Sequence, residues 1–203
     1  MKLKTTKPLI LASASPRRKE LLSLLGVPFE VKTMEVDEKT ISGHSPVELV
    51  CNIAMEKGMY VAERNQHAIV ISADTMVFID DTPLGKPDNA EMAKEYLRKL
   101  SGRTHTVITA VAMYFDGTCS MFFEKTKVTF YVLSEEWIEA YVASGDWFDK
   151  AGGYGIQTIG TLMVEHINGD YNNVVGLPIA ELYRELKNLN LIELPTTRSR
   201  YDH

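Results

Sequence analysis

The first part of the chain combines a short apolar run with a leucine-rich helical pattern, and this order limits the folds that are possible. Residues 9–12 have the composition of a buried strand, and residues 17–25 repeat leucine at helical spacing before Gly26, a typical helix end. The polar stretch Ser-Ala-Ser-Pro at residues 13–16 separates the two. A strand that leads through a short polar turn into a helix is a building unit of α/β proteins.

Three cations occupy the first turn of this predicted helix, where acidic residues are preferred. Arg17, Arg18 and Lys19 face the positive end of the helix dipole, which costs about 0.3–1 kcal/mol for each charge. A bound anion would offset that cost, because free N–H groups, the Ser13 and Ser15 hydroxyls and the guanidinium groups together suit a phosphate. A capped helix with solvated arginines explains the same residues, so both interpretations stay open.

Strand and helix patterns alternate through the first half of the chain, and antiparallel strands dominate its middle. Helix-capping sequences begin at Ser45 and Asp88, and Asp116-Gly117 is a hairpin turn signal. The expected strands cover residues 29–32, 68–72 with extended chain at 76–79, 105–115, 120–133 and 161–167. The later helices follow the capping sequences at Ser45, Asp88 and Ser134, and the last one opens at Pro178. We therefore predict an α/β fold with a mixed sheet and a cleft between two lobes.

Size and composition narrow the class of protein. We place a single domain at residues 8–192, with a flexible N-terminus at 1–7 and a polar tail at 193–203. The net charge of −5 argues against a nucleic-acid binder, and no apolar run reaches the roughly 18 residues of a membrane span. No signal sequence is evident, and Cys51 and Cys119 are expected as buried thiols of a reducing compartment. We therefore expect a cytoplasmic protein.

Asp74 is the first candidate for catalysis, because it follows the apolar run at residues 68–72 directly. A carboxylate at the carboxyl end of a buried strand lies where open α/β sheets bind their ligands. The alternative is that Asp74 forms a local Asx-turn with the backbone.

Two lysines and an acidic loop are further candidates. Lys57 lies beside the apolar stripe of its predicted helix, and Lys86 lies in a rigid Gly-Lys-Pro segment that enters the next helix. Either lysine could simply be solvated at the surface. Glu38 belongs to an acidic loop with Glu35 and Asp37, which could supply an oxygen ligand for Mg²⁺ or could be solvated.

The segment from Gly152 to Gln157 is rich in glycine, and glycine lets a backbone approach a ligand closely. Gln157 could read the edge of a base. The segment lacks the third glycine of the dinucleotide-binding fingerprint, and the chain contains no GxxxxGK[ST] phosphate loop. A tight turn without a ligand is the alternative. Taken together, cations, carboxylates and a glycine-rich loop are the components of a metal-dependent nucleotide phosphohydrolase.

These segments together resemble the Maf family of nucleoside triphosphate pyrophosphatases over about residues 8–190. The matching motifs are LASASPRRxELL at residues 11–22, Glu38, Lys57, ADT at 73–75, KP at 86–87, LSG at 100–102, DKAGxYGIQ at 149–157 and NVVGLP at 173–178. The resemblance implies an elongated mixed sheet similar to that of inosine triphosphatases. It also implies cleavage between the α and β phosphates, which releases a nucleoside monophosphate and pyrophosphate.

The resemblance further implies roles for individual residues. Asp74 matches the catalytic proton acceptor, and Glu38, Lys57 and Lys86 match other active-site positions. We further hypothesise that Ser13, Arg17 and Arg18 bind the triphosphate, and that Glu38 with Asp74 binds Mg²⁺ or Mn²⁺. A homodimer is a further expectation.

Three positions sort the family into subgroups. Arg17, Thr75 and Gln157 match the subgroup that acts on dTTP and UTP, whereas the 7-methyl-GTP subgroup typically carries Trp, Gln and Glu there. The glycine-rich loop resembles eukaryotic members, which implies that CTP and modified pyrimidine nucleotides could be accepted. Gly85 departs from the Glu that many members of this subgroup carry before the lysine. Two alternatives stay open: a phosphatase that removes a terminal phosphate, and a nucleotide-binding regulatory protein with vestigial hydrolysis.

Overall fold

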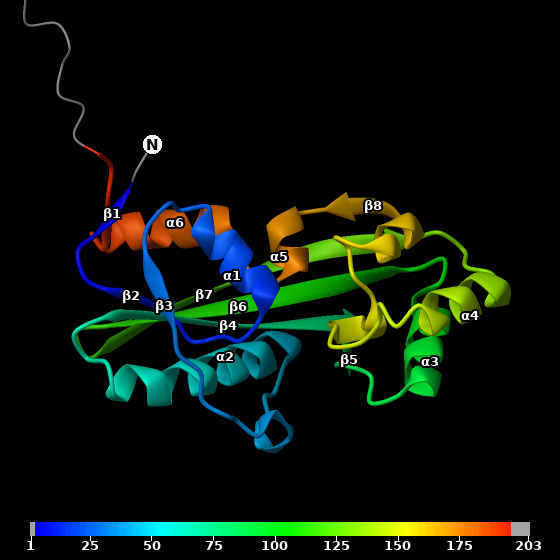
Figure 1. The fold of residues 1–203 in the computed structure, drawn as a ribbon. Coiled ribbons are helices and arrows are strands. Elements are labelled where there is room, and N and C mark those ends of the chain that lie inside the picture. Colours follow the sequence, from blue (N-terminus) through cyan, green and yellow to red (C-terminus); the bar gives the residue numbers. More distant parts are fainter. Residues whose placement is uncertain (1–2, 196–203) are drawn as a thin grey trace, which may run out of the picture.

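The apolar strands assemble into one mixed sheet in the computed structural model, which describes residues 3–195 (Figure 1). Seven strands of this described part form the sheet in the order β3-β2-β4-β6-β7-β8, and β5 pairs with the far end of β4. The strands are β2 (Leu9–Leu11), β3 (Phe29–Val31), β4 (Ile69–Ile79), β5 (Thr82–Leu84), β6 (Thr104–Phe115), β7 (Thr118–Phe130) and β8 (Val164–Asn168). The predicted α/β class with a mixed sheet is confirmed.

Helices cover both faces of the sheet and one of its ends. Helix α2 lies along one face, α1, α5 and α6 lie on the opposite face, and α3 and α4 lie together at one end (Figure 1). Their bounds are α1 (Pro16–Ser23), α2 (Pro46–Glu63), α3 (Ala90–Leu100), α4 (Glu135–Ala143), α5 (Tyr171–Val175) and α6 (Ile179–Asn188), with short 3₁₀ turns η1 (Glu38–Thr40), η2 (Ala151–Gly153) and η3 (Ile159–Met163). Within residues 3–195, no helix has both the length and the apolar character needed to cross a membrane.

Strand β4 is the centre of the sheet, and it is longer than its sequence pattern predicts. Its first residues, from Ile69 to Ile71, pair in parallel with β2. Its other edge pairs with β6 in antiparallel register from Val70 to Phe78. Asp74 therefore lies inside a continuous strand and not at its carboxyl end, because β6 supplies hydrogen bonds well beyond that residue. The neighbouring strand β2 does end at Leu11, which leaves that edge of β4 open near Asp74.

The turn and cap predictions were right in part. The Asp116-Gly117 turn joins β6 to β7, and both residues have the positive φ of a two-residue hairpin turn. The Ser45 hydroxyl caps α2 by accepting a hydrogen bond from the N–H of Glu48. Asn89, and not Asp88, caps α3, because the Asn89 side chain accepts from the N–H of Met92.

Several other local predictions were wrong. The strand predicted from residue 161 begins at Val164, because η3 occupies the preceding residues. Helix α5 had no predicted counterpart. Cys119 is exposed, whereas Cys51 is buried as expected.

The two ends of the described chain are joined, which differs from the predicted flexible N-terminus. Strand β1 (Lys4–Thr5) pairs in antiparallel register with β9 (Ile192–Glu193), and Leu3 is buried. Residues 3–7 and 192–193 therefore belong to the folded body. Of the predicted N-terminal segment and polar tail, residues 1–2 and 196–203 lie outside the described residues.

Helix α2 approaches the sheet unusually closely at Gly58. A Cβ atom at Gly58 would lie 2.3 Å from Ser72 Oγ and 2.6 Å from Tyr114 Cε2. At the same contact the Ser72 hydroxyl donates a 2.7 Å hydrogen bond to the carbonyl of Ala54. The absence of a side chain at residue 58 thus sets the height of α2 above β4 and β6, and it places the adjacent Lys57 over the sheet.

Gly58→Ala is expected to destabilise the protein. The added methyl group overpacks the helix–sheet contact, which typically costs about 1–3 kcal/mol. The better helix propensity of alanine, worth about 1 kcal/mol, offsets only part of that loss. Chemical denaturation measures the free energy of unfolding. Gly85→Ala is the matched control, because a Cβ atom there meets nothing within 4 Å. Equal stability of the two variants would contradict the close-approach interpretation.

Candidate active site

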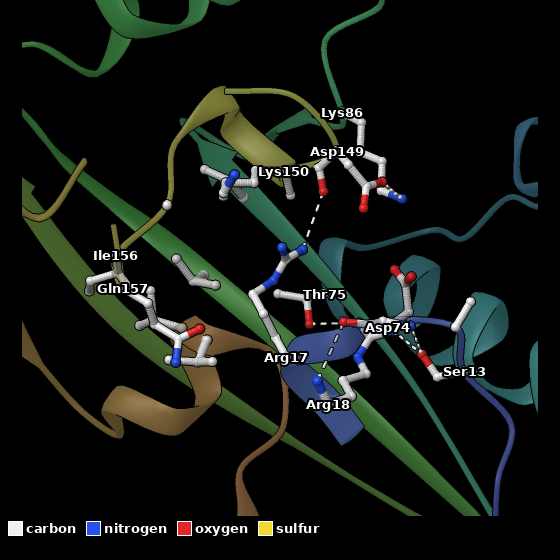
Figure 2. Close-up of a pocket in the computed structure, with 18 of the residues that line it drawn as sticks. Ser13, Arg17, Arg18, Asp74, Thr75, Lys86, Asp149, Lys150, Ile156 and Gln157 are labelled. Carbon is white, nitrogen blue, oxygen red and sulfur yellow. Dashed lines mark hydrogen bonds and ion pairs between the residues drawn. The ribbon is translucent and has the colours of Figure 1, made fainter. Parts of the chain in front are cut away.

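A polar cavity of about 470 Å³ opens beside the end of β2 and the middle of β4 (Figure 2). Its walls come from the β2–α1 turn, from α1, α2, β4, β6 and α5, and from three loops, at residues 33–38, 86 and 149–158. The nine residues predicted to be catalytic, substrate-binding or metal-binding all line it: Ser13, Arg17, Arg18, Glu38, Lys57, Asp74, Thr75, Lys86 and Gln157. Segments far apart in the sequence therefore converge on one site.

The β2–α1 turn forms the cationic side of the cavity. Ser15 caps α1 by accepting a 3.4 Å hydrogen bond from the N–H of Arg18, and Pro16 begins the helix. Ser13 Oγ accepts hydrogen bonds from the N–H of Ser15 and from the Arg18 guanidinium, each at 3.3 Å. The first turn of α1 contains no acidic residue, so its helix dipole and its cations all favour an anion in the cavity.

The Arg18 guanidinium is held by the protein itself. Besides Ser13, it donates 2.9 Å and 3.0 Å hydrogen bonds to the carbonyl of Gly176 and to Thr75 Oγ1 (Figure 2). Burial lowers the pKa of Arg18, and the nearby Asp74 carboxylate opposes that shift. Arg18 therefore ties α1 to β4 and to the end of α5, in addition to lining the cavity.

Arg17 and Lys86 reach the cavity from opposite elements and meet at Asp149. Lys86 Nζ lies 2.6 Å from the Asp149 carboxylate, and Arg17 donates a 3.2 Å hydrogen bond to the Asp149 carbonyl (Figure 2). Asp149 has a φ of 59°, which a residue other than glycine rarely adopts. One aspartate thus contacts both cations.

Asp74, Lys57 and Glu38 form a charged cluster on the α2 side of the cavity. Lys57 Nζ lies 2.6 Å from Asp74 Oδ1 and 2.8 Å from Glu38 Oε1. Asp74 is only 5% exposed, and within residues 3–195 its second oxygen, Oδ2, has no hydrogen-bond partner. One carboxylate oxygen is therefore neutralised by Lys57, and the other is buried without a hydrogen-bond partner in this part of the chain.

The pleat of β4 explains why neighbouring residues serve different parts of the site. Successive side chains of a strand point to opposite faces, so Asp74 faces α2 while Thr75 faces α1. Thr75 pairs in register with Thr109 of β6, and their hydroxyl oxygens lie 2.9 Å apart. The residue opposite Asp74 is Ala110, a small residue that leaves room beside the carboxylate.

The glycine-rich loop packs against the sheet and presents Gln157 at the cavity. Gly152 has a φ of 69°, and a Cβ atom there would lie 2.9 Å from Val77 Cγ2. The N–H of Gly152 donates a 3.0 Å hydrogen bond to the carbonyl of Gly85, next to Lys86. The Gln157 side chain is exposed at the cavity mouth, opposite the Asp74 side in Figure 2.

The Asp74 and Glu38 carboxylates suit a divalent metal ion whose coordination shell is completed by a bound ligand. Asp74 and Glu38 both contact Lys57, so they lie close together, and Asp74 Oδ2 is unpartnered within the described residues. Residues 3–195 contain no group of three or more His, Cys, Asp or Glu side chains that could hold a metal alone. Mg²⁺ typically binds through one or two carboxylates together with substrate phosphates. The arrangement fits that mode.

Sequence reasoning assigned no role to some of the residues found in the site. Asp149 was part of a quoted motif, but its contacts with Arg17 and Lys86 depend on loops that only the fold brings together. Lys150 and Tyr154 also line the cavity. The Tyr154 hydroxyl lies 2.8 Å from Nε2 of the buried His105. Burial lowers the pKa of His105 to about 4. For Asp149, the one signal in the sequence was its position as an acidic residue before the glycine-rich loop.

The fold and the cavity define an α/β protein that is equipped to bind a phosphorylated ligand, with cations for its phosphates and a carboxylate beside them. The chain belongs to the Maf-like protein family, whose family model matches residues 8–189. The resemblance seen in the motifs is thereby confirmed at the level of the family.

Named relatives cover nearly the whole chain. A dTTP/UTP pyrophosphatase of Bacillus cereus (strain ATCC 10987 / NRS 248) is 52% identical over 185 residues, which are 91% of each chain. A dTTP/UTP pyrophosphatase of Bacillus anthracis (strain CDC 684 / NRRL 3495) is 52% identical over 91% of this chain and 97% of its own. Among solved structures, the Staphylococcus aureus Ham1 protein aligns with a TM-score of 0.43 and 15% identity, over 61% of this chain and 72% of that chain.

Lys57→Met is expected to destabilise the protein by about 1–3 kcal/mol, because it leaves the Asp74 carboxylate buried beside an apolar side chain. Adding Asp74→Asn to Lys57→Met should then restore part of the lost stability, since the uncompensated charge disappears. Urea denaturation of the two single variants and the double variant measures this coupling.

Lys86→Met serves as the control, because the Lys86–Asp149 pair is at least half exposed on both sides and exposed pairs contribute less than about 1 kcal/mol. Equal losses for the two lysine variants would contradict a special role of Lys57 in holding a buried carboxylate.

Proposed function

We propose that this protein is a nucleoside triphosphate pyrophosphatase that hydrolyses dTTP and UTP to the nucleoside monophosphate and pyrophosphate. The observation that carries the proposal is the convergence of Asp74 and Glu38 on Lys57, beside Arg17 and Lys86, in a chain 52% identical to dTTP/UTP pyrophosphatases. We take residues 8–192 as its single catalytic unit.

In this proposal the cations of the cavity bind the triphosphate. Arg17 and Lys86 contact Asp149 in the free protein, so phosphate oxygens would replace Asp149 oxygens as their partners. Ser13 and the N-terminus of α1 add hydrogen-bond donors. A guanidinium has five N–H groups, of which Arg18 uses three within the protein, so two remain for phosphate. Lys57 and Lys86 would offset the negative charge that develops in the transition state.

Asp74 would act as the general base. Its Oδ1 is held by Lys57, which orients the carboxylate, and its Oδ2, buried and without a partner among the described residues, would accept the proton of a water molecule. The water oxygen attacks the α-phosphorus, a new phosphorus–oxygen bond forms, and the bond to the bridging oxygen breaks. Pyrophosphate leaves with the electrons of that bond, and the proton of the water passes to Asp74.

A divalent cation, Mg²⁺ or Mn²⁺, belongs to the same proposal. Glu38 would hold it together with Asp74 and the phosphate oxygens of the substrate. When bound, such a cation neutralises phosphate charge and draws electron density from the reacting phosphorus.

Base recognition is assigned to Gln157, with Arg17 and Thr75 shaping the same cavity. Uracil and thymine present an N–H donor between two carbonyl acceptors, and the amide of Gln157 can both donate and accept. An amide turned by 180° presents its groups in the opposite order, so CTP and modified pyrimidine nucleotides fall within the proposed substrate class. The proposed place of action is the cytoplasm, where nucleoside triphosphates are found. The homodimer and the absence of nucleic-acid binding stay predictions.

Asp74→Asn is expected to lower kcat by about 10²–10⁴-fold, because an amide cannot accept the proton of the attacking water. Pyrophosphate release from dTTP and UTP, with Mg²⁺ and with Mn²⁺, measures this loss, and circular dichroism verifies folding. Asp81→Asn, in the exposed turn between β4 and β5, is the matched control and should keep wild-type turnover.

A folded Asp74→Asn protein with near wild-type kcat would refute this role. Orthophosphate without pyrophosphate would instead indicate a terminal phosphatase. Tight triphosphate binding by the wild-type protein with negligible turnover would indicate a regulatory nucleotide-binding protein.

Gln157→Glu should weaken hydrolysis of dTTP and UTP by about tenfold or more, the cost of leaving a hydrogen-bonding group of the base unpaired. A carboxylate only accepts hydrogen bonds, whereas the amide also donates them. The measurement is kcat/KM across a panel of pyrimidine and purine triphosphates. Gln66→Glu adds the same charge at an exposed turn outside the cavity and is the control. An unchanged substrate profile would remove Gln157 from base recognition.

A further inference from the structure

We infer that Asp146 is a positioning residue for substrate selection: it anchors the loop of residues 155–158, so that Gln157 is held at the height where a base is read. This inference rests on the proposed function and deepens it. Asp146 lies outside the cavity lining, in the turn that follows α4, and no role has been given to it above.

The Asp146 carboxylate accepts two hydrogen bonds and forms one ion pair. Its Oδ2 accepts from Tyr141 at 2.8 Å and from Thr158 at 2.6 Å. Lys150 Nζ lies 3.5 Å from Oδ1 and also donates to the backbone carbonyl of Asp146. The side chains of Asp146 and Lys150 are only 17% and 16% exposed, so solvent competes weakly for these contacts. The cluster therefore joins the end of α4 to both ends of the glycine-rich loop.

Tyr141 extends this anchor to the backbone beside Gln157. Its hydroxyl donates to Asp146 and accepts a 3.3 Å hydrogen bond from the N–H of Gly155. Tyr141 is 3% exposed, so its ring is fixed by the core of the protein. Gly155 and Thr158, the residues that bracket Ile156 and Gln157, are thus both connected to one carboxylate.

Close packing inside the loop transmits this constraint to Gln157. A Cβ atom at Gly155 would lie 2.4 Å from Thr158 Oγ1 and 2.7 Å from Lys150 Cε. A Cβ atom at Gly160 would lie 2.6 Å from the Gly155 carbonyl oxygen. The backbone on either side of Gln157 therefore has little freedom. Because the Gln157 side chain is itself exposed, the direction in which its amide points depends on that backbone.

The charge state of Asp146 is consistent with an anchor. Burial alone would raise the pKa of Asp146, but hydrogen bonds from Thr158 and Tyr141 and the charge of Lys150 outweigh burial and lower it. Asp146 is therefore a carboxylate at neutral pH and can accept all of these hydrogen bonds at once.

The test compares Asp146→Asn with Glu135→Gln, which removes a carboxylate from the same end of the molecule. Glu135 lies in the first turn of α4 and pairs with Arg98, far along the helix from the loop. Asp146→Asn should raise KM for dTTP and UTP about tenfold, the size of one or two weakened hydrogen bonds, with kcat within about twofold. It should also lower the ratio of kcat/KM for these substrates to kcat/KM for purine triphosphates, so that the enzyme discriminates less. Tyr141→Phe should produce part of the same effect, and Glu135→Gln none.

A double-variant cycle separates positioning from general loss of structure. If Asp146 acts through Gln157, Asp146→Asn should not change base preference further in a Gln157→Ala background. Unchanged KM and base preference in folded Asp146→Asn would overturn the inference, and so would an effect that is the same with and without Gln157.

Hydrogen exchange of residues 154–158 in the ligand-free protein gives a readout without turnover. Exchange should be faster in Asp146→Asn and Tyr141→Phe than in the wild type and in Glu135→Gln. Unchanged exchange would overturn the inference even if KM or base preference is altered. A wild-type protein that releases no pyrophosphate from any nucleotide would overturn the proposed function alone, because the exchange measurement still decides the role of Asp146.

Discussion

The contact between Lys57 and Asp74 is the interaction on which the rest of the site depends. It joins helix α2 to the central strand β4, and it neutralises a carboxylate that is 95% removed from solvent by the fold. A buried carboxylate without a counter-charge is strongly unfavourable, and Lys57 supplies that counter-charge to Asp74. That proximity in turn requires the close approach of α2 at Gly58 and the early end of β2, which opens one edge of β4.

The site is arranged around the two faces of β4. On the α2 face, Asp74, Lys57 and Glu38 supply the charges suited to hydrolysis, while on the α1 face Thr75 and Arg18 form a hydrogen-bond network with Gly176. The two cations that project from outside this strand both contact Asp149: Lys86 pairs with its carboxylate, and Arg17 donates to its backbone carbonyl. In the proposed function, phosphate oxygens of the substrate would take the place of these Asp149 oxygens.

The sequence predicted the composition of the site better than its geometry. Asp74 was expected at the end of a strand, and this was wrong, because pairing with β6 carries β4 on to Ile79. The reasoning still led to the right region, since the strand that ends there is β2, and the cavity lies at its carboxyl end. The cap of α3 was predicted at Asp88 but is Asn89. Both residue types are suited to capping, so only the position of the first turn of α3 selects between them.

The sequence alone determined the α/β class, the family, and the residue types that line the cavity, because apolar periodicity and motif spacing are local properties of a chain. The tertiary structure decided which of those residues touch. The Lys57–Asp74 pair spans 17 residues and the Arg17–Asp149 contact spans 132, and both depend on sheet register and helix height. The anchoring of Gln157 by Asp146 and Tyr141 likewise arises only where α4 meets the glycine-rich loop. Hydrogen bonds and ion pairs require contact within a few ångströms, and a linear pattern of residues does not contain that distance.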